Sequence, residues 1–425
     1  MRGRLHDLKK GGALILVGGV IAALLTSCQP DAATPDATVP AVEETATASS
    51  PATETAEPTD TPAPTDTPHP ADTATPAATA TEASATEEPA EEEEAEVEPS
   101  PEGLVFAPFG DGPVVPNGAP GSFDSQFTDP GAAVFHDGLF HMFHNGFTGW
   151  PAPVGIAYST SPDGYEWTRV QDDPVFRGDD LEYVGLTVLA SSALVEPDGT
   201  WVLYFYTWDA RIWPNSSSSI GRATAPDPLG PWTADPQPVL LPGSEGTWDE
   251  LAVRTPSVIR TEDGYVMFYA GVSAGADQAM IGMATSADGV SWTKYDDAAT
   301  TDALFAESDP VFRPGEEGAW DAGNVEHPRV ALVDGRYVMV YSGKARLNVP
   351  SVLGYATSED GVSWQRAPDP ILEATMIPGG RAIWFLELVH HEDTYFLFFE
   401  LGTGGQTEVY LATHEGELPG GEAQE

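Results

Sequence analysis

The chain has 425 residues, a formal net charge of −48 at neutral pH and a single cysteine. So acidic a surface repels phosphate backbones, which argues against nucleic acid as a partner and leaves neutral ligands such as sugars. One cysteine excludes an intrachain disulfide, so a folded domain must depend on its own hydrophobic core.

Residues 1–28 have the layout of a bacterial signal peptide. Four basic residues precede an uncharged, mostly apolar run over residues 11–25, which is short for a membrane span. The run ends in Leu25-Thr-Ser-Cys28, which resembles the lipobox of bacterial lipoproteins. The resemblance implies that Cys28 is acylated, so we expect a lipid anchor on the extracytoplasmic face of the cell membrane. An ordinary signal peptide is the alternative.

Residues 29–102 consist mainly of Pro, Thr, Ala and Glu, with almost no large apolar side chains. Such a segment cannot bury enough surface to offset the entropy of ordering. We therefore expect a disordered linker without chemistry, followed by one domain over residues 103–425.

That domain repeats itself five times, at intervals of about 55 to 70 residues, which is a sign of a repeat architecture. In each copy a turn of the Asp-Gly type separates two apolar strands and predicts a hairpin. These turns are Asp137-Gly138, Asp198-Gly199, Asp263-Gly264, Asp334-Gly335 and the variant Glu392-Asp393. A second turn is followed by a tryptophan that we expect in the core: Trp167, Trp232, Trp292 and Trp364. Four antiparallel strands per repeat predict an all-β fold, a five-bladed β-propeller.

The fifth repeat lacks a fourth strand. Residues 111–115 are similar to residues 172–176 and 309–312, which follow the tryptophan strand in other repeats. The segment near residues 104–116 is therefore expected to supply the outer strand of the last blade and to join the ring.

The innermost strands begin with polar residues that are expected to face the central channel. Asp129, Thr255 and Glu326 each lie eight residues before an aspartate of a turn, which predicts equivalent positions around the channel. Loops and channel mouths commonly carry functional sites. Trp248-Asp249, Trp320-Asp321 and Phe123-Asp124 also recur, and we interpret them as structure that links blades.

Three short motifs resemble those of the five-bladed propeller glycosidases of glycoside hydrolase families 32 and 43. They are Asp129-Pro130, Arg254-Thr255-Pro256 and Glu326-His327-Pro328. The resemblance implies that Asp129 is the base or nucleophile and Glu326 the general acid, and glycosidic cleavage requires such a carboxyl pair. Where those families carry an acidic helper, this chain has Thr255. Asp249 is our first candidate to replace it, and Thr255→Asp is expected to raise the activity of a hydrolase.

Further polar and aromatic residues on the same face are candidates for binding sugar hydroxyls or stacking on sugar rings. The alternatives are solvated loop residues and packing between loops. The candidates are Arg254, Thr255, His327, His144, Asn145, Trp208, Asp209, Arg211 and Trp384, with Trp150 and Trp213 as further loop aromatics.

No zinc-type Cys/His spacing, phosphate-binding glycine loop or serine nucleophile motif is present in the sequence. We expect no metal and no cofactor; a central Ca²⁺ occurs in some family 43 propellers, but nothing in this sequence indicates one. We also expect a monomer.

The leading hypothesis is a membrane-tethered glycoside hydrolase that acts on an oligo- or polysaccharide. A lipoprotein that binds glycans without turnover is the second hypothesis, because of Thr255 and the loop tryptophans. The third is a glycoside phosphorylase, as in the related family 130 propellers. It would need a basic phosphate pocket, for which Arg254, Lys344 and Arg346 are the obvious cluster.

Overall fold

The computed structural model describes residues 106–149, 151–212, 216–274, 278–346 and 349–418. These ranges contain 21 strands, three single-turn 3-10 helices and no α-helix, so the all-β prediction is confirmed. Within them no helix is long and apolar enough to cross a membrane. Cys28, the expected linker, Trp150 and Trp213 lie outside the described residues.

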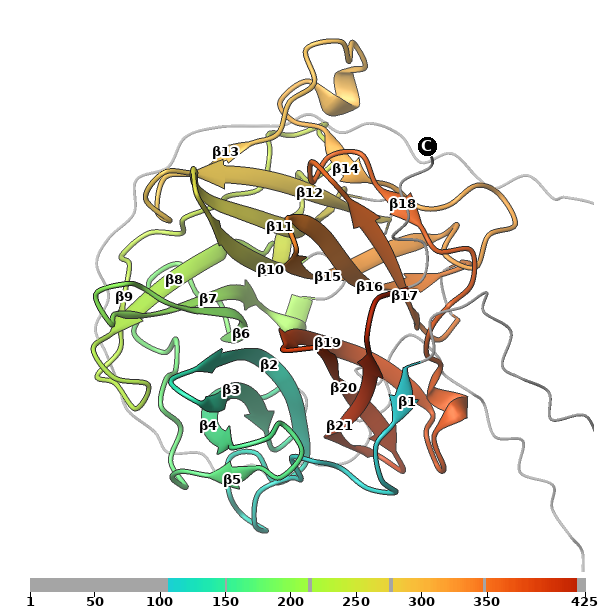
Figure 1. The fold of residues 1–425 in the computed structure, drawn as a ribbon. Helices are drawn as coiled ribbons and strands as arrows, with labels where there is room; N and C mark the ends of the chain where they lie inside the picture. Colours follow the sequence, from blue (N-terminus) through green and yellow to red (C-terminus); the bar gives the residue numbers. More distant parts are fainter. Residues whose placement is uncertain (1–105, 150, 213–215, 275–277, 347–348, 419–425) are drawn as a thin grey trace, which may run out of the picture. The chain divides into compact units, whose positions relative to one another are not determined.

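The strands form antiparallel units that we number as repeats 1 to 5 (Figure 1). In repeats 1 to 4 the four main strands follow chain order from the innermost strand outward. Repeat 1 comprises β2 (Phe127–His136), β3 (Leu139–Phe147), β4 (Gly155–Ser161) and β5 (Thr168–Arg169). Repeat 2 comprises β6 (Thr187–Val195), β7 (Trp201–Trp208), β8 (Ile220–Ala225) and β9 (Thr233–Ala234). Repeat 3 comprises β10 (Ala252–Thr261), β11 (Gly264–Val272), β12 (Ala279–Ser286) and β13 (Thr293–Lys294), with β14 (Pro310–Phe312) also paired to β12. Repeat 4 comprises β15 (Asn324–Val333), β16 (Arg336–Lys344), β17 (Val352–Ser358) and β18 (Gln365–Arg366). Repeat 5 comprises β19 (Ala382–His391), β20 (Thr394–Thr403), β21 (Gln406–Glu415) and β1 (Ala107–Pro108). The 3-10 helices are η1 (Ala210–Ile212), η2 (Ala303–Phe305) and η3 (Ala374–Met376).

The outer strand of repeat 5 comes from the beginning of the described chain. Ala107 pairs with Thr413 in antiparallel register, and Val115 forms a further bridge to Val409. The similarity of residues 111–115 to the outer segments of other repeats had predicted this pairing. The free edge of β21 is thereby covered.

The hydrophobic core lies between the repeats rather than within one of them. Four buried clusters each join two neighbouring repeats, and a fifth joins repeats 1, 2 and 3. The cluster around Phe140 and Phe398 joins repeat 5 to repeat 1. The innermost strands β2, β6, β10, β15 and β19 contact one another in this order, and β19 contacts β2. The fold is therefore propeller-like. The tryptophans expected in the core are partly buried against these clusters: Trp167, Trp232, Trp292 and Trp364.

Serine side chains connect neighbouring innermost strands. The Ser192 hydroxyl on β6 accepts the backbone N–H of Val258 on β10 at 3.0 Å. The Ser257 hydroxyl on β10 accepts the N–H of Val330 on β15 at the same distance. These side chains satisfy buried amides that strand pairing leaves free.

An aspartate in the loop before the innermost strand pairs with a cation on the outer strand of the same repeat. The three pairs are Asp124 with Arg169, Asp249 with Lys294 and Asp321 with Arg366. The hypothesis that these loop aspartates are structural therefore fits the contacts. Asp249 is already bonded to Lys294 and Tyr269, so it is not available as a replacement acid.

Candidate functional site

Each innermost strand of repeats 1, 3 and 4 is interrupted by a bulge that sets the position of its polar residues. Asp129 pairs with Asn145 and Glu326 pairs with Ser342, each immediately before the bulge. In β10 the residue at this place is Arg254, which pairs with Ala270. A bulge next to a site commonly directs a side chain toward it.

The expected equivalence of Thr255 with Asp129 and Glu326 was therefore wrong by one residue. The turn of repeat 3 consists of Glu262 and Asp263, because Gly264 already pairs with Thr261 as part of β11. The expected alignment took Asp263 as the first residue of the turn, so it was displaced by one residue. Arg254 occupies the position at which the related families carry an acidic helper. Thr255→Asp would not place a carboxylate there, so it is no longer expected to raise activity.

Asp129 is a buried carboxyl that keeps one oxygen free. Its Oδ1 accepts the backbone N–H of Gly131 at 2.9 Å and the Asn145 amide at 2.8 Å. Its Oδ2 has no hydrogen-bond partner among the described residues. Burial raises the pKa of Asp129 to about 7, against the lowering effects of those two bonds and of Arg329. A proton therefore resides on Asp129 for part of the time at neutral pH.

Glu400 on β20 is a second buried carboxyl beside Asp129. β20 belongs to repeat 5, whose strand β21 meets β2 through the pairing of Thr407 with Phe127. Burial, and then the charge of Asp129, raises the pKa of Glu400 well above its usual value. Two such carboxyls cannot both ionise at low cost, so they behave as a coupled pair that retains a proton.

Glu326 has the opposite surroundings. Its Oε2 accepts a hydrogen bond from Arg254 Nη2 at 2.6 Å, and its Oε1 accepts one from the Asn324 amide at 2.7 Å. Lys344 Nζ lies 3.6 Å from Oε1. Burial alone would raise the pKa of Glu326, but the charges of Arg254 and Lys344 outweigh it and lower the pKa to about 2. Glu326 is thus ionised throughout the physiological range.

Arg329 connects the innermost strands of several repeats. Its Nη2 donates to the Ser191 hydroxyl on β6 at 3.0 Å, and its Nη1 donates to the carbonyl of Pro328 at 2.8 Å. Its Nε lies 3.4 Å from Glu387 Oε2 on β19. Burial raises the pKa of Glu387 to about 7, although Arg329 opposes this. Sequence reasoning missed Arg329, Glu387 and Glu400; a charged residue inside an apolar strand, as in Phe-Leu-Glu-Leu-Val, was the available signal.

Thr255 and His327 both have left-handed backbone, with φ of 52° and 53°. For β-branched Thr255 this conformation is an outlier that costs free energy. Its Oγ1 is buried and has no hydrogen-bond partner within the described ranges. His327 Nδ1 bonds the Ser342 hydroxyl at 2.9 Å, and burial lowers the pKa of His327 to about 3, so its imidazole is neutral. Both residues lie directly beside the Arg254–Glu326 pair.

The other expected binding residues divide into two groups. Asn145 lies at the site, where its amide joins Asp129 to the backbone of Ala190. His144 faces the opposite side of β3 and bonds Ser159. The remaining four residues make local or structural contacts. Asp209 and Arg211 pair with each other, Trp208 packs against the cluster that joins repeats 1 to 3, and the Trp384 ring lies against Gly402.

The basic residues expected for a phosphate pocket do not form a free cationic cluster. Arg254 and Lys344 both turn toward Glu326, and Arg346 is exposed. No group of three or more metal-ligating side chains occurs in the described part of the chain.

Comparisons with known proteins agree with this architecture. The family model of the glycosyl hydrolases family 32 N-terminal domain matches residues 124–308. An uncharacterized protein of Mycobacterium tuberculosis is 26% identical over 226 residues, which are 51% of this chain and 69% of that protein. A 1,2-beta-oligomannan phosphorylase of Thermoanaerobacter is 25% identical over 153 residues, 33% of this chain and 47% of that enzyme.

Solved glycoside hydrolases share the fold. A glycosyl hydrolase from Bacteroides ovatus superposes with a TM-score of 0.56 at 17% identity, covering 74% of this chain and 94% of that one. A structure from the GH130 family of mannoside phosphorylases, described as containing glycoside hydrolases that target beta-1,2 mannosidic linkages in Candida mannan, gives 0.56 at 19% identity, covering 75% and 95%. The resemblance to the propeller glycosidases is thus confirmed.

Proposed function

We propose that this chain is a glycoside hydrolase that cleaves neutral oligo- or polysaccharide at the centre of a closed, five-bladed propeller. The observation that carries the proposal is the matching position of Asp129 and Glu326. They occupy the same bulge position on two innermost strands, but their carboxyls have opposite proton affinities. Two carboxyls with separated pKa values are what glycosidic cleavage requires.

The proposed roles differ from those that the family resemblance implied. Asp129 is the proton donor, because its buried carboxyl holds a proton near pH 7 and has a free Oδ2. Glu326 is the ionised carboxylate that stabilises positive charge on the sugar or activates water, because Arg254 keeps it charged. Thr255, His327 and Asn145 are the nearest candidates for contacts with sugar hydroxyls.

Hydrolysis is favoured over phosphorolysis by the position of Glu326. Its negative charge lies against Arg254 and Lys344, the two cations that a phosphate would need, and repels an anion from that place. The matching oligomannan phosphorylase makes phosphate dependence a necessary measurement.

The test is release of sugar from a panel of plant and microbial oligosaccharides by the full-length protein. Asp129→Asn and Glu326→Gln should each lower kcat by about 10²–10⁴, the usual contribution of acid–base catalysis. Glu166→Gln, an exposed acid of repeat 1, serves as the control and should retain full activity. Full activity in both site variants contradicts the assignment. A sugar phosphate as product, with a rate that depends on inorganic phosphate, contradicts hydrolysis.

Glycan binding without turnover is the second candidate. It is favoured by the low pKa of Glu326, because the family resemblance assigns this position to a general acid, which must hold a proton. Titration calorimetry distinguishes the two: saturable binding with no product over hours supports binding alone. Any turnover that Glu326→Gln abolishes excludes it.

The proposed location is the extracytoplasmic face of the cell membrane, through lipid on Cys28 and a linker over residues 29–102. Fatty-acid labelling of the full-length protein should be lost in Cys28→Ser, together with membrane association. Labelling that survives this substitution contradicts the anchor.

A further inference from the structure

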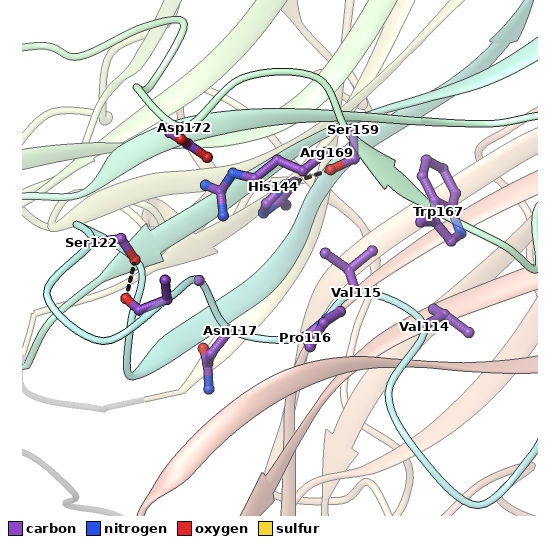
Figure 2. Close-up of a pocket in the computed structure, with 12 residues that line it drawn as sticks. Val114, Val115, Pro116, Asn117, Ser122, His144, Ser159, Trp167, Arg169 and Asp172 are labelled. Atoms are coloured by element: carbon purple, nitrogen blue, oxygen red, sulfur yellow. Dashed lines mark hydrogen bonds between the residues drawn. The ribbon is translucent and has the colours of Figure 1, made fainter.

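A hollow of about 450 Å³ lies on repeat 1 (Figure 2). One wall is the segment Val114–Ser122, which leads from β1 into repeat 1. The other wall is formed by strands β3 to β5 and the turn after them. The side chains that determine its chemistry are Val115, Pro116, His144, Ser159, Trp167 and Arg169. Neither Asp129 nor Glu326 is among its lining residues.

The hollow occurs where repeat 1 departs from the pattern of repeats 3 and 4. His144 lies two residues after Met142, as Tyr269 follows Met267 and Tyr341 follows Met339. Strand register makes these positions equivalent, because the three methionines pair with corresponding residues of the third strand. Histidine therefore replaces a tyrosine in repeat 1.

A second substitution accompanies the first. Met142 pairs with Ser159, whereas Met267 and Met339 pair with alanines, Ala284 and Ala356. His144 Nε2 bonds the Ser159 hydroxyl at 3.0 Å. Repeat 1 thus carries a matched polar pair where the other two repeats carry a tyrosine and an alanine.

The exchange leaves hydrogen-bonding capacity unused. Tyr341 donates its hydroxyl to the loop aspartate Asp321 at 2.8 Å, and Tyr269 reaches Asp249 at 3.3 Å. The shorter imidazole of His144 bonds Ser159 instead, and its Nδ1 has no partner in the described part of the chain. Nη2 of Arg169 is likewise buried without a hydrogen bond within the described ranges. Buried polar atoms without partners are uncommon and point to a ligand or water.

The walls select a neutral ligand. Arg169 is neutralised by Asp124, and burial together with the charge of Arg169 lowers the pKa of His144 to about 3, so the imidazole carries no charge. Val115, Pro116 and the half-buried Trp167 supply apolar surface beside these polar groups. A ring with hydroxyls on its edge and C–H groups on its face combines both requirements.

We propose that this hollow is a second carbohydrate site, which binds one neutral sugar unit through His144 and Arg169. It is separate from the central acids and does not depend on the proposed hydrolysis. Its role is to hold glycan on the outer part of repeat 1 while the central site acts or releases product.

The experiment restores the pattern of the other repeats. The double substitution His144→Tyr with Ser159→Ala introduces the tyrosine–alanine pair of repeats 3 and 4. Ala157 faces residue 144, where those repeats have Gly282 and Gly354 beside the tyrosine, so thermal unfolding of the variant is measured first. Imidazole nitrogen chemical shifts of the full-length protein are recorded during titration with mannose, glucose, galactose and fructose, and with glycerol as a control. At least one sugar should shift the His144 nitrogens saturably, and Glu326→Gln should leave this shift unchanged. Calorimetry on the Glu326→Gln background should show that the double variant loses this binding by at least about tenfold in Kd.

Two outcomes overturn the proposal. One is the absence of a saturable His144 shift with any sugar at tens of millimolar, which indicates a hollow that holds only water. The other is unchanged sugar affinity in the folded double variant. If the double variant fails to fold, Ser159→Ala is tested alone, because it removes the hydrogen-bond partner of His144 Nε2. His144 chemical shifts that respond to sugar as in the wild type then contradict the site.

Discussion

Asp129 and Glu326 occupy the same position on two strands of one repeating architecture, yet their surroundings are opposite. Beside Asp129 lies another buried carboxyl, Glu400, and no cation bonds the Asp129 carboxyl among the described residues. Beside Glu326 lie Arg254 and Lys344. Burial is similar at both places, so the neighbours alone decide which carboxyl keeps its proton.

This contrast shows how a repeat fold generates acid–base chemistry. The backbone supplies matching bulges on β2, β10 and β15. At this position β10 carries Arg254 where the other two strands carry an acid, and Arg254 helps to keep Glu326 on β15 ionised. Each of the following changes alters one side of the contrast and leaves the other intact.

The largest effect is expected from Arg254→Met. Removing one partner of a buried ion pair leaves an uncompensated charge and costs about 3–5 kcal/mol; the remaining Lys344 favours the lower end. In the wild type the pKa of Glu326 is lowered to about 2, so its stabilisation is present above its usual pKa and is lost as the pH falls toward 2. Urea unfolding should therefore show a difference between variant and wild type that shrinks as the pH falls. Arg260→Met is the control, since Arg260 forms an exposed pair with Glu196 that contributes at most about 1 kcal/mol. Equal losses in both variants contradict a special role of Arg254.

Asn145→Leu acts on the other side. It removes the amide that donates to Asp129 Oδ1 and lowers the pKa of that carboxyl, so the pKa of Asp129 should rise. The raised pKa of Asp129 means that the folded chain holds a proton that the unfolded chain has lost between about pH 4 and 7, so stability declines as the pH rises through this window. The variant should show a larger decline, and the alkaline limb of its activity profile should move to higher pH. Glu415→Gln, at the exposed end of β21, should change neither. An alkaline limb that stays in place contradicts Asp129 as the proton donor.

Thr255→Gly is expected to have the smallest effect and the opposite sign. Glycine adopts a φ of 52° without steric cost, so the substitution should stabilise the fold by about 1 kcal/mol in thermal unfolding. If the Thr255 hydroxyl contacts sugar, KM should rise while kcat changes little. Thr261→Gly, at the end of the same strand but outside the left-handed region, should destabilise instead. Stabilisation without any change in KM assigns Thr255 no part in binding.

The sequence predicted the all-β, propeller-like repeat architecture because its signals are local. Asp-Gly turns, core tryptophans and apolar strands recur in each repeat, and the similarity of residues 111–115 to other outer segments was enough to place β1 against β21. The loop aspartates were also interpreted correctly as structural, since their recurrence beside an aromatic residue is a property of the repeat.

The site was predicted only in part, because its chemistry depends on neighbours distant in sequence. Asp129 and Glu326 were found from their motifs, but the direction of their pKa shifts depends on burial at Asp129 and on Arg254 beside Glu326, which only folding brings about. The alignment of Thr255 failed because one turn had shifted by a residue. His144 was expected at the central site, but alternation along β3 directs it to the opposite face from Asn145.

The docking of β1 also has a consequence for folding. The backbone of Asn117, in the segment that follows β1, donates to Glu408 of β21, 291 residues later in the chain. Contacts of such sequence separation form slowly, because a long loop must close before they contribute. Repeat 5 therefore cannot cover its outer edge until almost the whole domain has been synthesised. A chain interrupted before β21 would expose unpaired strand edges at both ends, which marks it for proteolysis or aggregation.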